Sequence, residues 1–472
     1  MKYNLIIPCS GPGSRSSSYN KFHKALLRIG PYAVIDHIIA AYPYANTVYI
    51  MLGHNQEYIR QYIEHAGYTN VEFITIDNWE ESQISSLRQI PKHVYDAPFY
   101  LNSCDNWSPV VPTVTENTVY ICNTHNNNYY DSIDNHGIFA GIGYVKDTMD
   151  FYNALHSIDA VRNDYLVYNK LNKLNHVALD KWYDVGNIES YNITKLSFND
   201  RFDLLDKNHQ EIYYVNNRIV KLFKNTTSKL ENTLNNSSSF PHPQPIKFTT
   251  NGISYNFVPG ETNVVDKNFN RVFSNLELLW TYCINNNSTI VAKNIWREKT
   301  LERFDMMLRK YPEFTKKITL NGVPIDPIRL IENLDWQKIY TGIVGPCHGD
   351  LILENIVVND NQIYYIDHRE TTVDDIFYDI CKFYHNLHLN NINLKNYELD
   401  VDDNNYNINV ELMFRDRLDT FKESSIYKNN IEKIELGVGC IWLSMAPLNV
   451  DDNLNKFLFL YSMRQLYNAS GI

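Results

Sequence analysis

Residues 4–15, NLIIPCSGPGSR, join a short apolar run to a glycine-containing turn, which is the pattern of a buried strand and the turn that follows it. An amphipathic helix is expected next, at residues 33–42. Further strands are expected at 47–52, from residue 71 and at 98–102, with helices at 56–66 and near 82–92. Strands and helices in this order form a mostly parallel sheet that helices cover on both faces. The first half is therefore predicted to be a doubly wound, Rossmann-like α/β domain whose ligands bind beyond the carboxyl ends of the strands.

The composition limits the classes of function. The chain has 472 residues, more than one hydrophobic core usually organises, so two or three domains are expected. Its 43 basic and 54 acidic residues leave a net charge of −11, which argues against a nucleic-acid partner. The seven cysteines form no C-x-x-C pair, which argues against a disulfide framework or structural zinc. No apolar run suits a signal peptide or a membrane span, so we expect a cytoplasmic protein without a membrane-spanning helix.

The pattern changes near residues 199–207, where a second domain is expected to begin. Residues 211–223, EIYYVNNRIVKLF, alternate apolar and polar side chains on either side of Asn216-Asn217, which predicts a β-hairpin. The segment 226–245 is rich in Asn, Ser and Pro and is expected to contain a short helix at 228–234. From residue 273 onward helices are expected to dominate, apart from two short apolar strands.

The first candidate site is the turn after residues 4–8. Gly11 and Gly13 let the backbone approach a ligand closely, and successive N–H groups there can bind phosphate oxygens. Arg15 and Lys24 would add positive charge. Taken alone, a glycine turn of this kind is equally compatible with a plain connection.

Four segments together resemble one family, the nucleoside triphosphate transferases that make activated sugars and phosphocholine-type headgroups. They span residues 1–196 in the family's order: PCSGPGSR…HKALLRIGPYAVIDHII, VYIMLGHNQEYIRQYI, PFYLNSCDNW and KWYDVGNIESYNITK. The resemblance implies a nucleotidyltransferase in which Gly11, Gly13, Arg15 and Lys24 hold the triphosphate and Asp105 and Asp184 hold Mg²⁺.

This chain departs from the family in two places, and one assignment has an alternative. His23 stands where the family usually has proline, and Lys21 is an alternative to Lys24 as the basic residue. Asp184 precedes Gly186, so it is also compatible with an ordinary turn aspartate.

The second candidate site is CHGDLILEN, residues 347–355, with YIDHR at 365–369. Phosphoryl transfer from ATP needs an acceptor for the hydroxyl proton and side chains that hold Mg²⁺ on the phosphates. Asp350 would be the base, and Asn355 and Asp367 would be the metal ligands. The five-position spacing from Asp350 to Asn355 equals that of the kinase catalytic loop. His348 is expected to brace this loop and not to act as the base.

This second motif resembles the aminoglycoside phosphotransferase and choline kinase family, whose fold is a two-lobed, protein-kinase-like α+β domain. The family's nucleotide-holding lysine would be Lys221, with Glu231 as its partner, although residues 207–221 lack the glycines of a phosphate-covering loop. The resemblance implies a nucleotidyltransferase domain at 1–197, a kinase small lobe at 205–262 and a kinase helical lobe at 263–472.

Together the two motifs predict a bifunctional enzyme for cell-surface or capsule polysaccharide assembly. ATP would phosphorylate a small amino alcohol, polyol or sugar, and a second NTP would convert the phosphomonoester to its nucleotide adduct. The short first domain favours CTP. Trp280, Trp296, Trp336 and Trp442 could either box a quaternary ammonium group or fill the core. Alternatives are a kinase with a non-catalytic nucleotide-binding module, a glycosyltransferase-like first domain, and an antibiotic-inactivating kinase.

Overall fold

The computed structural model describes residues 2–122, 132–133, 137–159, 164–198, 209–225, 235–260, 266–359, 362–369, 373–389, 396–412 and 414–471. The chain divides into two compact units. Unit 1 comprises Met1–Thr227 and Gln244–Phe257, and unit 2 comprises Ser228–Pro243 and Val258–Ile472.

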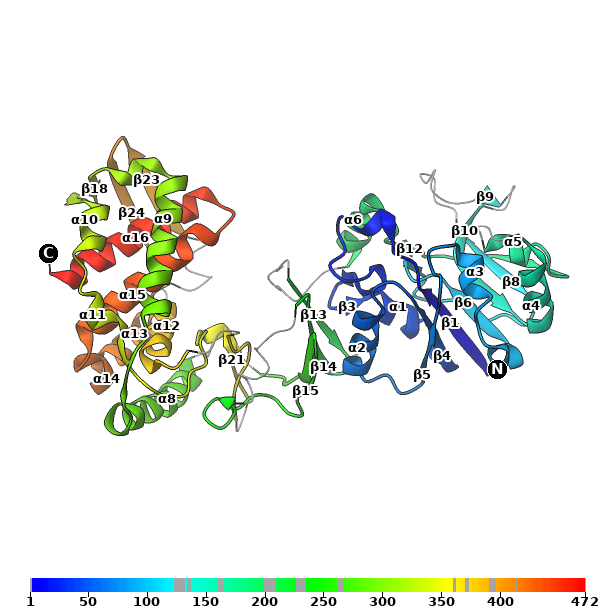
Figure 1. Ribbon diagram of the computed structural model, residues 1–472, viewed down its shortest axis with the longest axis horizontal. Helices are drawn as coiled ribbons and strands as arrows, with labels where there is room; N and C mark the ends of the chain where they lie inside the picture. The colour runs from blue at the N-terminus through cyan, green and yellow to red at the C-terminus, as the bar shows by residue number, and fades with distance from the viewer. Residues whose placement is uncertain are drawn as a thin grey trace. The chain divides into compact units, whose positions relative to one another are not determined.

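A mixed sheet forms the centre of unit 1 (Figure 1). Its strands are, in spatial order, β11 (Asn175–Ala178), β8 (Thr118–Cys122), β10 (Gly137–Val145), β6 (Phe99–Asn102), β1 (Tyr3–Cys9), β4 (Ala45–Leu52) and β5 (Val71–Thr75), with β9 (Ser132–Ile133) paired to β10. β1 is parallel to β4 and β6, and β4 is parallel to β5. β10 is antiparallel to β6 and β8. The predicted α/β class with a parallel-rich, Rossmann-like sheet is confirmed.

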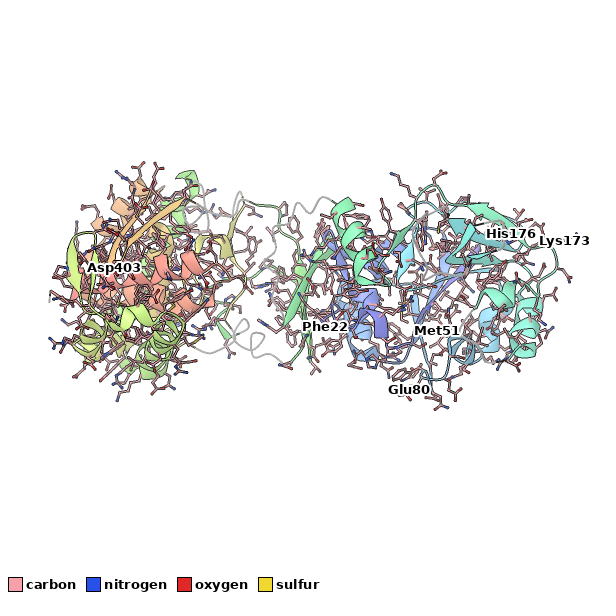
Figure 2. The ribbon with its side chains drawn as sticks, turned by 90° about the horizontal axis from the view of Figure 1, so that it is seen from above. Phe22, Met51, Glu80, Lys173, His176 and Asp403 are labelled. Carbon is pink, nitrogen blue, oxygen red and sulfur yellow. The ribbon has the colours of Figure 1, made fainter. Side chains whose placement is uncertain are left out.

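Helices pack on both faces of this sheet because its strands are apolar on both sides. Leu5 and Ile7 of β1 belong to one hydrophobic cluster, whereas Ile6 of β1 and Met51 of β4 belong to another. Figure 2 labels Met51. The helices are α1 (Val34–Ala40), α2 (Gln56–Ala66), α3 (Gln83–Leu87), α4 (Thr148–Ser157), α5 (Tyr165–Tyr168) and α6 (Ile188–Ser197). The helix expected near 82–92 is shorter: Ser82 caps α3, which ends at Leu87, ahead of Pro91.

Short helices and two short strand pairs also occur in the described part of residues 1–200. They are the 3-10 helices Ser14–Ser16, Lys24–Leu26 and Lys92–Asp96, the pair β2 (Arg28–Ile29) and β3 (Tyr32–Ala33), and the pair β7 (Asn106–Trp107) and β12 (Tyr183–Asp184).

A second sheet in unit 1 contains the expected hairpin. Its strand order is β13 (Gln210–Val215), β14 (Arg218–Phe223), β16 (Gly252–Asn256) and β15 (Lys247–Thr249). Asn216 and Asn217 both have positive φ, as a tight hairpin turn requires. Tyr213 packs its ring against Tyr62 of α2 at 4.8 Å between centroids and donates a hydrogen bond to the carbonyl of Leu26. By its contacts this sheet belongs to unit 1, whereas the sequence analysis groups residues 205–262 with the second domain.

Unit 2 is mainly helical, with one large hydrophobic core. Its helices are α8 (Asp266–Asn286), α9 (Lys299–Lys310), α10 (Pro327–Glu332), α11 (Trp336–Tyr340), α12 (Ile376–His388), α13 (Arg415–Glu423), α14 (Ser425–Lys428), α15 (Ile431–Met445) and α16 (Asp452–Ser470). Two of its sheets have two strands each: β17 (Thr289–Val291) pairs with β20 (Thr341–Ile343), and β21 (Ile356–Val358) pairs with β22 (Ile363–Tyr365). A third sheet has the strand order β19 (Val323–Ile325), β18 (Ile318–Leu320), β24 (Asn405–Val410) and β23 (Tyr397–Asp402).

The tryptophans of unit 2 fill its core. Trp280, Trp296 and Trp442 are at most 1% exposed. Trp336 is half-buried and donates its indole N–H to the carbonyl of Ile331. The core alternative is therefore the one that the structure supports, and these side chains build no aromatic box.

In the part of the chain that the structure describes, no helix combines the length and apolar character that crossing a membrane requires.

Candidate functional sites

A cleft of about 660 Å³ lies in unit 1 where β1 and β6 end. The glycine turn lines one side of it, and residues 103–106 line another. Gly13 has a φ of 60°, in the left-handed region, so its backbone conformation favours glycine. A Cβ added at Gly11 would meet no protein atom within 4 Å, so this backbone faces open space. The turn therefore leaves room for a ligand to approach the main chain.

Lys24 and Asp105 form an ion pair beside this turn. Lys24 Nζ lies 2.9 Å from Asp105 Oδ2, and both residues line the cleft together with Arg15. Burial by itself would raise the pKa of Asp105, but the Lys24 ammonium and the charge of Arg15 outweigh it and hold that pKa below its usual value. Asp105 is therefore ionised, and the cleft presents a carboxylate and two cations.

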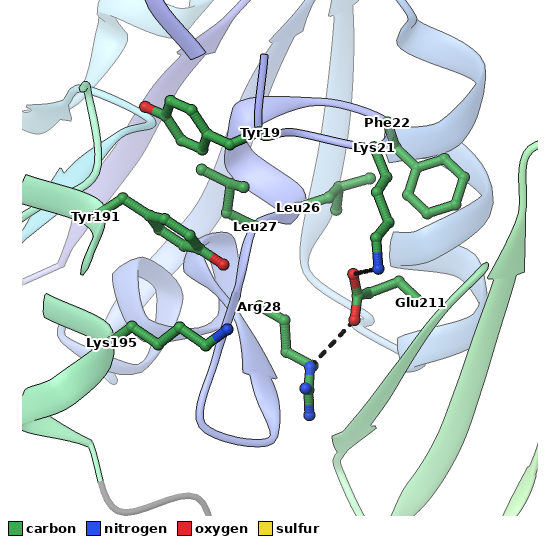
Figure 3. Close-up of a pocket in the computed structure, with 9 residues that line it drawn as sticks. All are labelled: Tyr19, Lys21, Phe22, Leu26, Leu27, Arg28, Tyr191, Lys195 and Glu211. Atoms are coloured by element: carbon green, nitrogen blue, oxygen red, sulfur yellow. Dashed lines mark ion pairs between the residues drawn. The ribbon is translucent and has the colours of Figure 1, made fainter. Parts of the chain in front are cut away.

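His23 and Lys21 have roles outside this ion pair. His23 caps the 3-10 helix that begins at Lys24, accepting the N–H of Ala25 on Nδ1 at 3.1 Å. Burial lowers the pKa of His23 to about 3, so the ring is neutral and serves to position the start of this helix. Lys21 pairs with Glu211 at 3.0 Å in a separate small pocket, where Arg28 binds the same carboxylate at 3.1 Å (Figure 3). Of the two lysines, Lys24 is the one that lines the cleft.

Asp184 lies on the strand next to Asp105. β12 pairs with β7 so that Asp184 is opposite Asn106, and the N–H of Val185 donates to the carbonyl of Asp105 at 2.8 Å. Asp184 Oδ1 also accepts the N–H of Gly186 at 3.0 Å, so Asp184 makes the turn contact that the alternative interpretation expects. Both interpretations are thus compatible with its place next to Asp105.

The donor set fits a magnesium ion that is bound mostly by substrate and water. Among the described residues, no group of three or more His, Cys, Asp or Glu side chains could hold a metal ion. Asp105 directly precedes β7 and Asp184 lies on β12, which pairs with β7, so two carboxylates come from adjacent segments. Mg²⁺ is commonly held by one or two carboxylates, with phosphate oxygens and water in its other positions.

In unit 2, Asp379 of α12 holds the loop that contains Asp350. Its two carboxylate oxygens accept the N–H groups of His348 at 2.6 Å and Gly349 at 2.8 Å. Gly349 has a φ of 82°, which favours glycine. Burial raises the pKa of Asp379 to about 7, against the lowering effect of the two N–H donors. The sequence analysis assigned no role to Asp379; the D-x-x-x-D pattern of residues 375–379 was the signal that could have identified it.

Asp350 is held on its other side by Lys382 and Asn355. Lys382 Nζ lies 2.8 Å from Asp350 Oδ1, and Asn355 Nδ2 donates to the Asp350 carbonyl at 2.9 Å. Burial would raise the pKa of Asp350, but Lys382 outweighs this and lowers it, while the charge of Asp367 acts to raise it. Asp350 is therefore ionised, as a proton acceptor must be. The effect of Asp367 on this pKa shows that its charge acts on Asp350.

His348 braces the loop from inside. Its Nε2 lies 2.9 Å from the carbonyl oxygen of Ile366, and its Nδ1 accepts the N–H of Asp350 at 3.3 Å. Burial lowers the pKa of His348 to about 4, so the ring is neutral. Because Nδ1 accepts a hydrogen bond, the ring proton is on Nε2 and donates to Ile366. His348 thus holds the loop in place through hydrogen bonds to the backbone, as the sequence analysis expects.

Lys221 lies on β14 in unit 1 and is buried, with its ammonium 6.0 Å from the centre of the Tyr255 ring. Its expected partner Glu231 and the helix expected at 228–234 lie outside the described residues. The nucleotide-holding role of this pair stays a prediction.

Comparison with known proteins gives matches among solved structures. Neither a family model nor a curated protein matches the chain. CTP:phosphocholine cytidylyltransferase from Streptococcus pneumoniae aligns with a TM-score of 0.35 and 14% identity, over 42% of this chain and 99% of that one. A nucleoside-diphosphate-sugar pyrophosphorylase from Vibrio cholerae gives 0.34 and 13%, over 41% and 99%. The inositol-1-phosphate CTP transferase from T. maritima gives 0.34 and 11%, over 41% and 94%.

Proposed function

We propose that this chain is a bifunctional enzyme with one phosphoryl-transfer site in each unit. Unit 2 phosphorylates a small hydroxylated molecule with ATP. Unit 1 then joins the resulting phosphomonoester to a nucleotidyl group from a second NTP, for which CTP is favoured, and releases pyrophosphate. Such a product suits the assembly of cell-surface polysaccharide.

In unit 1 the reaction needs charge compensation more than a base. A phosphomonoester oxygen forms a bond to the α-phosphorus of the NTP while the bond to pyrophosphate breaks. This nucleophile is already an anion, so the barrier lies in bringing it to a triphosphate. Lys24 and Arg15 supply positive charge, the N–H groups of the glycine turn bind phosphate oxygens, and Asp105 and Asp184 would hold the Mg²⁺ that offsets the triphosphate charge.

In unit 2 the nucleophile is a hydroxyl group, which must lose a proton. Asp350 accepts this proton while the oxygen bonds to the γ-phosphorus of ATP and ADP leaves. Asn355 and Asp367 would hold Mg²⁺ on the phosphates. The observation behind this assignment is the position of Asp350, which pairs with Lys382 and accepts a hydrogen bond from Asn355, on a loop that Asp379 anchors.

The test uses the full chain in two assays. ADP formation is followed with ATP and a panel of hydroxylated acceptors. Pyrophosphate release is followed with CTP, UTP, GTP, ATP or dTTP and a panel of phosphomonoesters. Activity in both assays supports the proposal. ADP formation without pyrophosphate release for any NTP supports the alternative of a kinase with a non-catalytic first unit.

A further inference from the structure

Three cations gather around one tyrosine beside Asp350. Tyr378, in the first turn of α12, is 2% exposed. Its hydroxyl oxygen accepts hydrogen bonds from Lys299 Nζ at 3.2 Å and from Arg369 Nη1 at 2.6 Å. Lys382 lies one turn further along α12 and binds Asp350. Residues from α9 and from the segment after β22 thus meet at Tyr378, one turn of α12 before the lysine that binds the proposed base.

The charges of this cluster shift the pKa values of Lys299 and Tyr378. Burial lowers the pKa of Lys299; Tyr378 acts to raise it, whereas the charges of Arg369 and Lys382 lower it further. Burial would raise the pKa of Tyr378, but Lys382, Lys299 and Arg369 together bring it below its usual value. Like charges held at partly buried positions repel one another, and a bound anion would remove this repulsion.

The cluster is also accessible from solvent. The Asp350 side chain is 36% exposed, whereas that of Lys382 is 13% exposed. Lys299 and Arg369 are both half-buried. An anion that reached Lys299 and Arg369 would therefore lie at the hydroxyl group of Tyr378, on which the charge of Asp350 also acts.

We propose that Lys299 and Arg369 bind an anionic group, a carboxylate or a phosphate, of the molecule that unit 2 phosphorylates. This rests on the proposed kinase function and narrows its acceptor to hydroxylated acids or hydroxylated phosphate esters. It disfavours choline and other cationic acceptors, which Lys299 and Arg369 would repel. The burial of Trp280, Trp296 and Trp442 agrees with this, because it leaves those rings no part in a cation-binding box.

The first experiment measures binding without turnover. Inorganic phosphate is titrated into the full chain and into its Lys299→Met and Lys316→Met variants, by calorimetry. Lys316 is an exposed lysine of the same unit and serves as the matched control. A hydrogen bond to a charged group corresponds to a factor on the order of ten or more in affinity, so Lys299→Met should weaken phosphate binding by about tenfold. Equal affinity in the three proteins would overturn the anion site.

The second experiment measures ADP formation with matched acceptors: glycerate as the anion, glycerol as its neutral counterpart and choline as the cation. Glycerate should be preferred by about tenfold or more in kcat/KM. Lys299→Met should raise the KM for glycerate and leave the KM for ATP unchanged. Lys299→Arg keeps the charge, so it should retain glycerate activity and shows that loss in Lys299→Met is not misfolding. A preference for glycerol or choline would overturn the proposal.

Two further outcomes separate this inference from the proposed function. If Lys299→Met raised the KM for ATP instead of that for glycerate, the cluster would hold a nucleotide phosphate and the acceptor assignment would be wrong. If no acceptor yielded ADP while Lys299→Met still weakened phosphate binding, the kinase function would fail and the anion site would stand.

Discussion

Each candidate site contains an ion pair between a lysine and an aspartate, but the surroundings of the two pairs differ. Lys24 and Asp105 in unit 1 and Lys382 and Asp350 in unit 2 are each separated by less than 3 Å, and in both pairs the lysine lowers the pKa of the carboxyl against the effect of burial. In unit 1 the pair borders a cleft of about 660 Å³. In unit 2 the carboxylate belongs to a loop that Asp379 ties to α12.

This difference agrees with the two reactions that we propose for the two units. A phosphomonoester needs no base, so a cleft with cations and room for a triphosphate is sufficient. A hydroxyl group needs a proton acceptor at one position, so the loop must be held in place. In unit 1, loss of a charge at the cleft should therefore reduce the activity, and in unit 2, loss of the proton acceptor or of its position should do so.

The largest effect is expected for Asp350→Asn. An amide cannot accept the hydroxyl proton, so ADP formation should fall by about a thousandfold, within the range usual for losing a general base. ATP binding should be retained. Pyrophosphate release by unit 1 from a supplied phosphomonoester should not change, since the residues of its cleft all lie in unit 1. Near-normal ADP formation in this variant would show that Asp350 is not the base.

Asp105→Ala and Asp184→Ala test the other site. Each removes one of the two carboxylates proposed for Mg²⁺, so pyrophosphate release should fall by about a hundredfold or more. ADP formation should be unaffected. Asp180 is an exposed acid near β12, and Asp180→Ala should retain both activities. If Asp184→Ala behaved like Asp180→Ala, Asp184 would be a turn residue and not a metal ligand.

Tyr213→Ala tests the assignment of β13–β16 to unit 1. Tyr213 is fully buried against Tyr62, so its removal leaves a cavity and should lower the free energy of unfolding of unit 1 by about 3 kcal/mol. Chemical denaturation, monitored by pyrophosphate release and ADP formation, gives the midpoint for each unit. Tyr214→Ala is the control, because Tyr214 is only half-buried. A lower midpoint for ADP formation alone would place the sheet with unit 2.

The smallest effect is a pH dependence from Asp379. Its folded-state pKa of about 7 lies above the usual value of 3.8, so between these pH values the folded chain keeps a proton that the unfolded chain has lost. Its contribution to stability is complete below pH 3.8 and is lost as the pH rises toward 7. The difference in melting temperature between the wild type and Asp379→Asn should therefore shrink over this range. A difference that grew with pH would contradict the raised pKa.

The sequence by itself determined the features that are local in the chain. The alternation of apolar strands with amphipathic helices predicted the α/β sheet of unit 1, because both periodicities can be read within a few residues. The hairpin turn at Asn216-Asn217 and the spacing from Asp350 to Asn355 are local for the same reason. The sequence also showed the glycine turn after β1, but it did not show the cleft that this turn lines.

Only the tertiary structure decided which distant residues meet. It paired Lys24 with Asp105 and Lys21 with Glu211, joined β13–β16 to α2, and brought Asp379 to the backbone of Gly349. It also gathered Lys299, Arg369 and Tyr378, which lie up to 79 positions apart. Such contacts depend on how whole helices and strands pack, and a contact between distant residues leaves no periodic pattern in either segment. Lys21 and Lys24 are close together in the chain, and for this reason they can still have different partners in the fold.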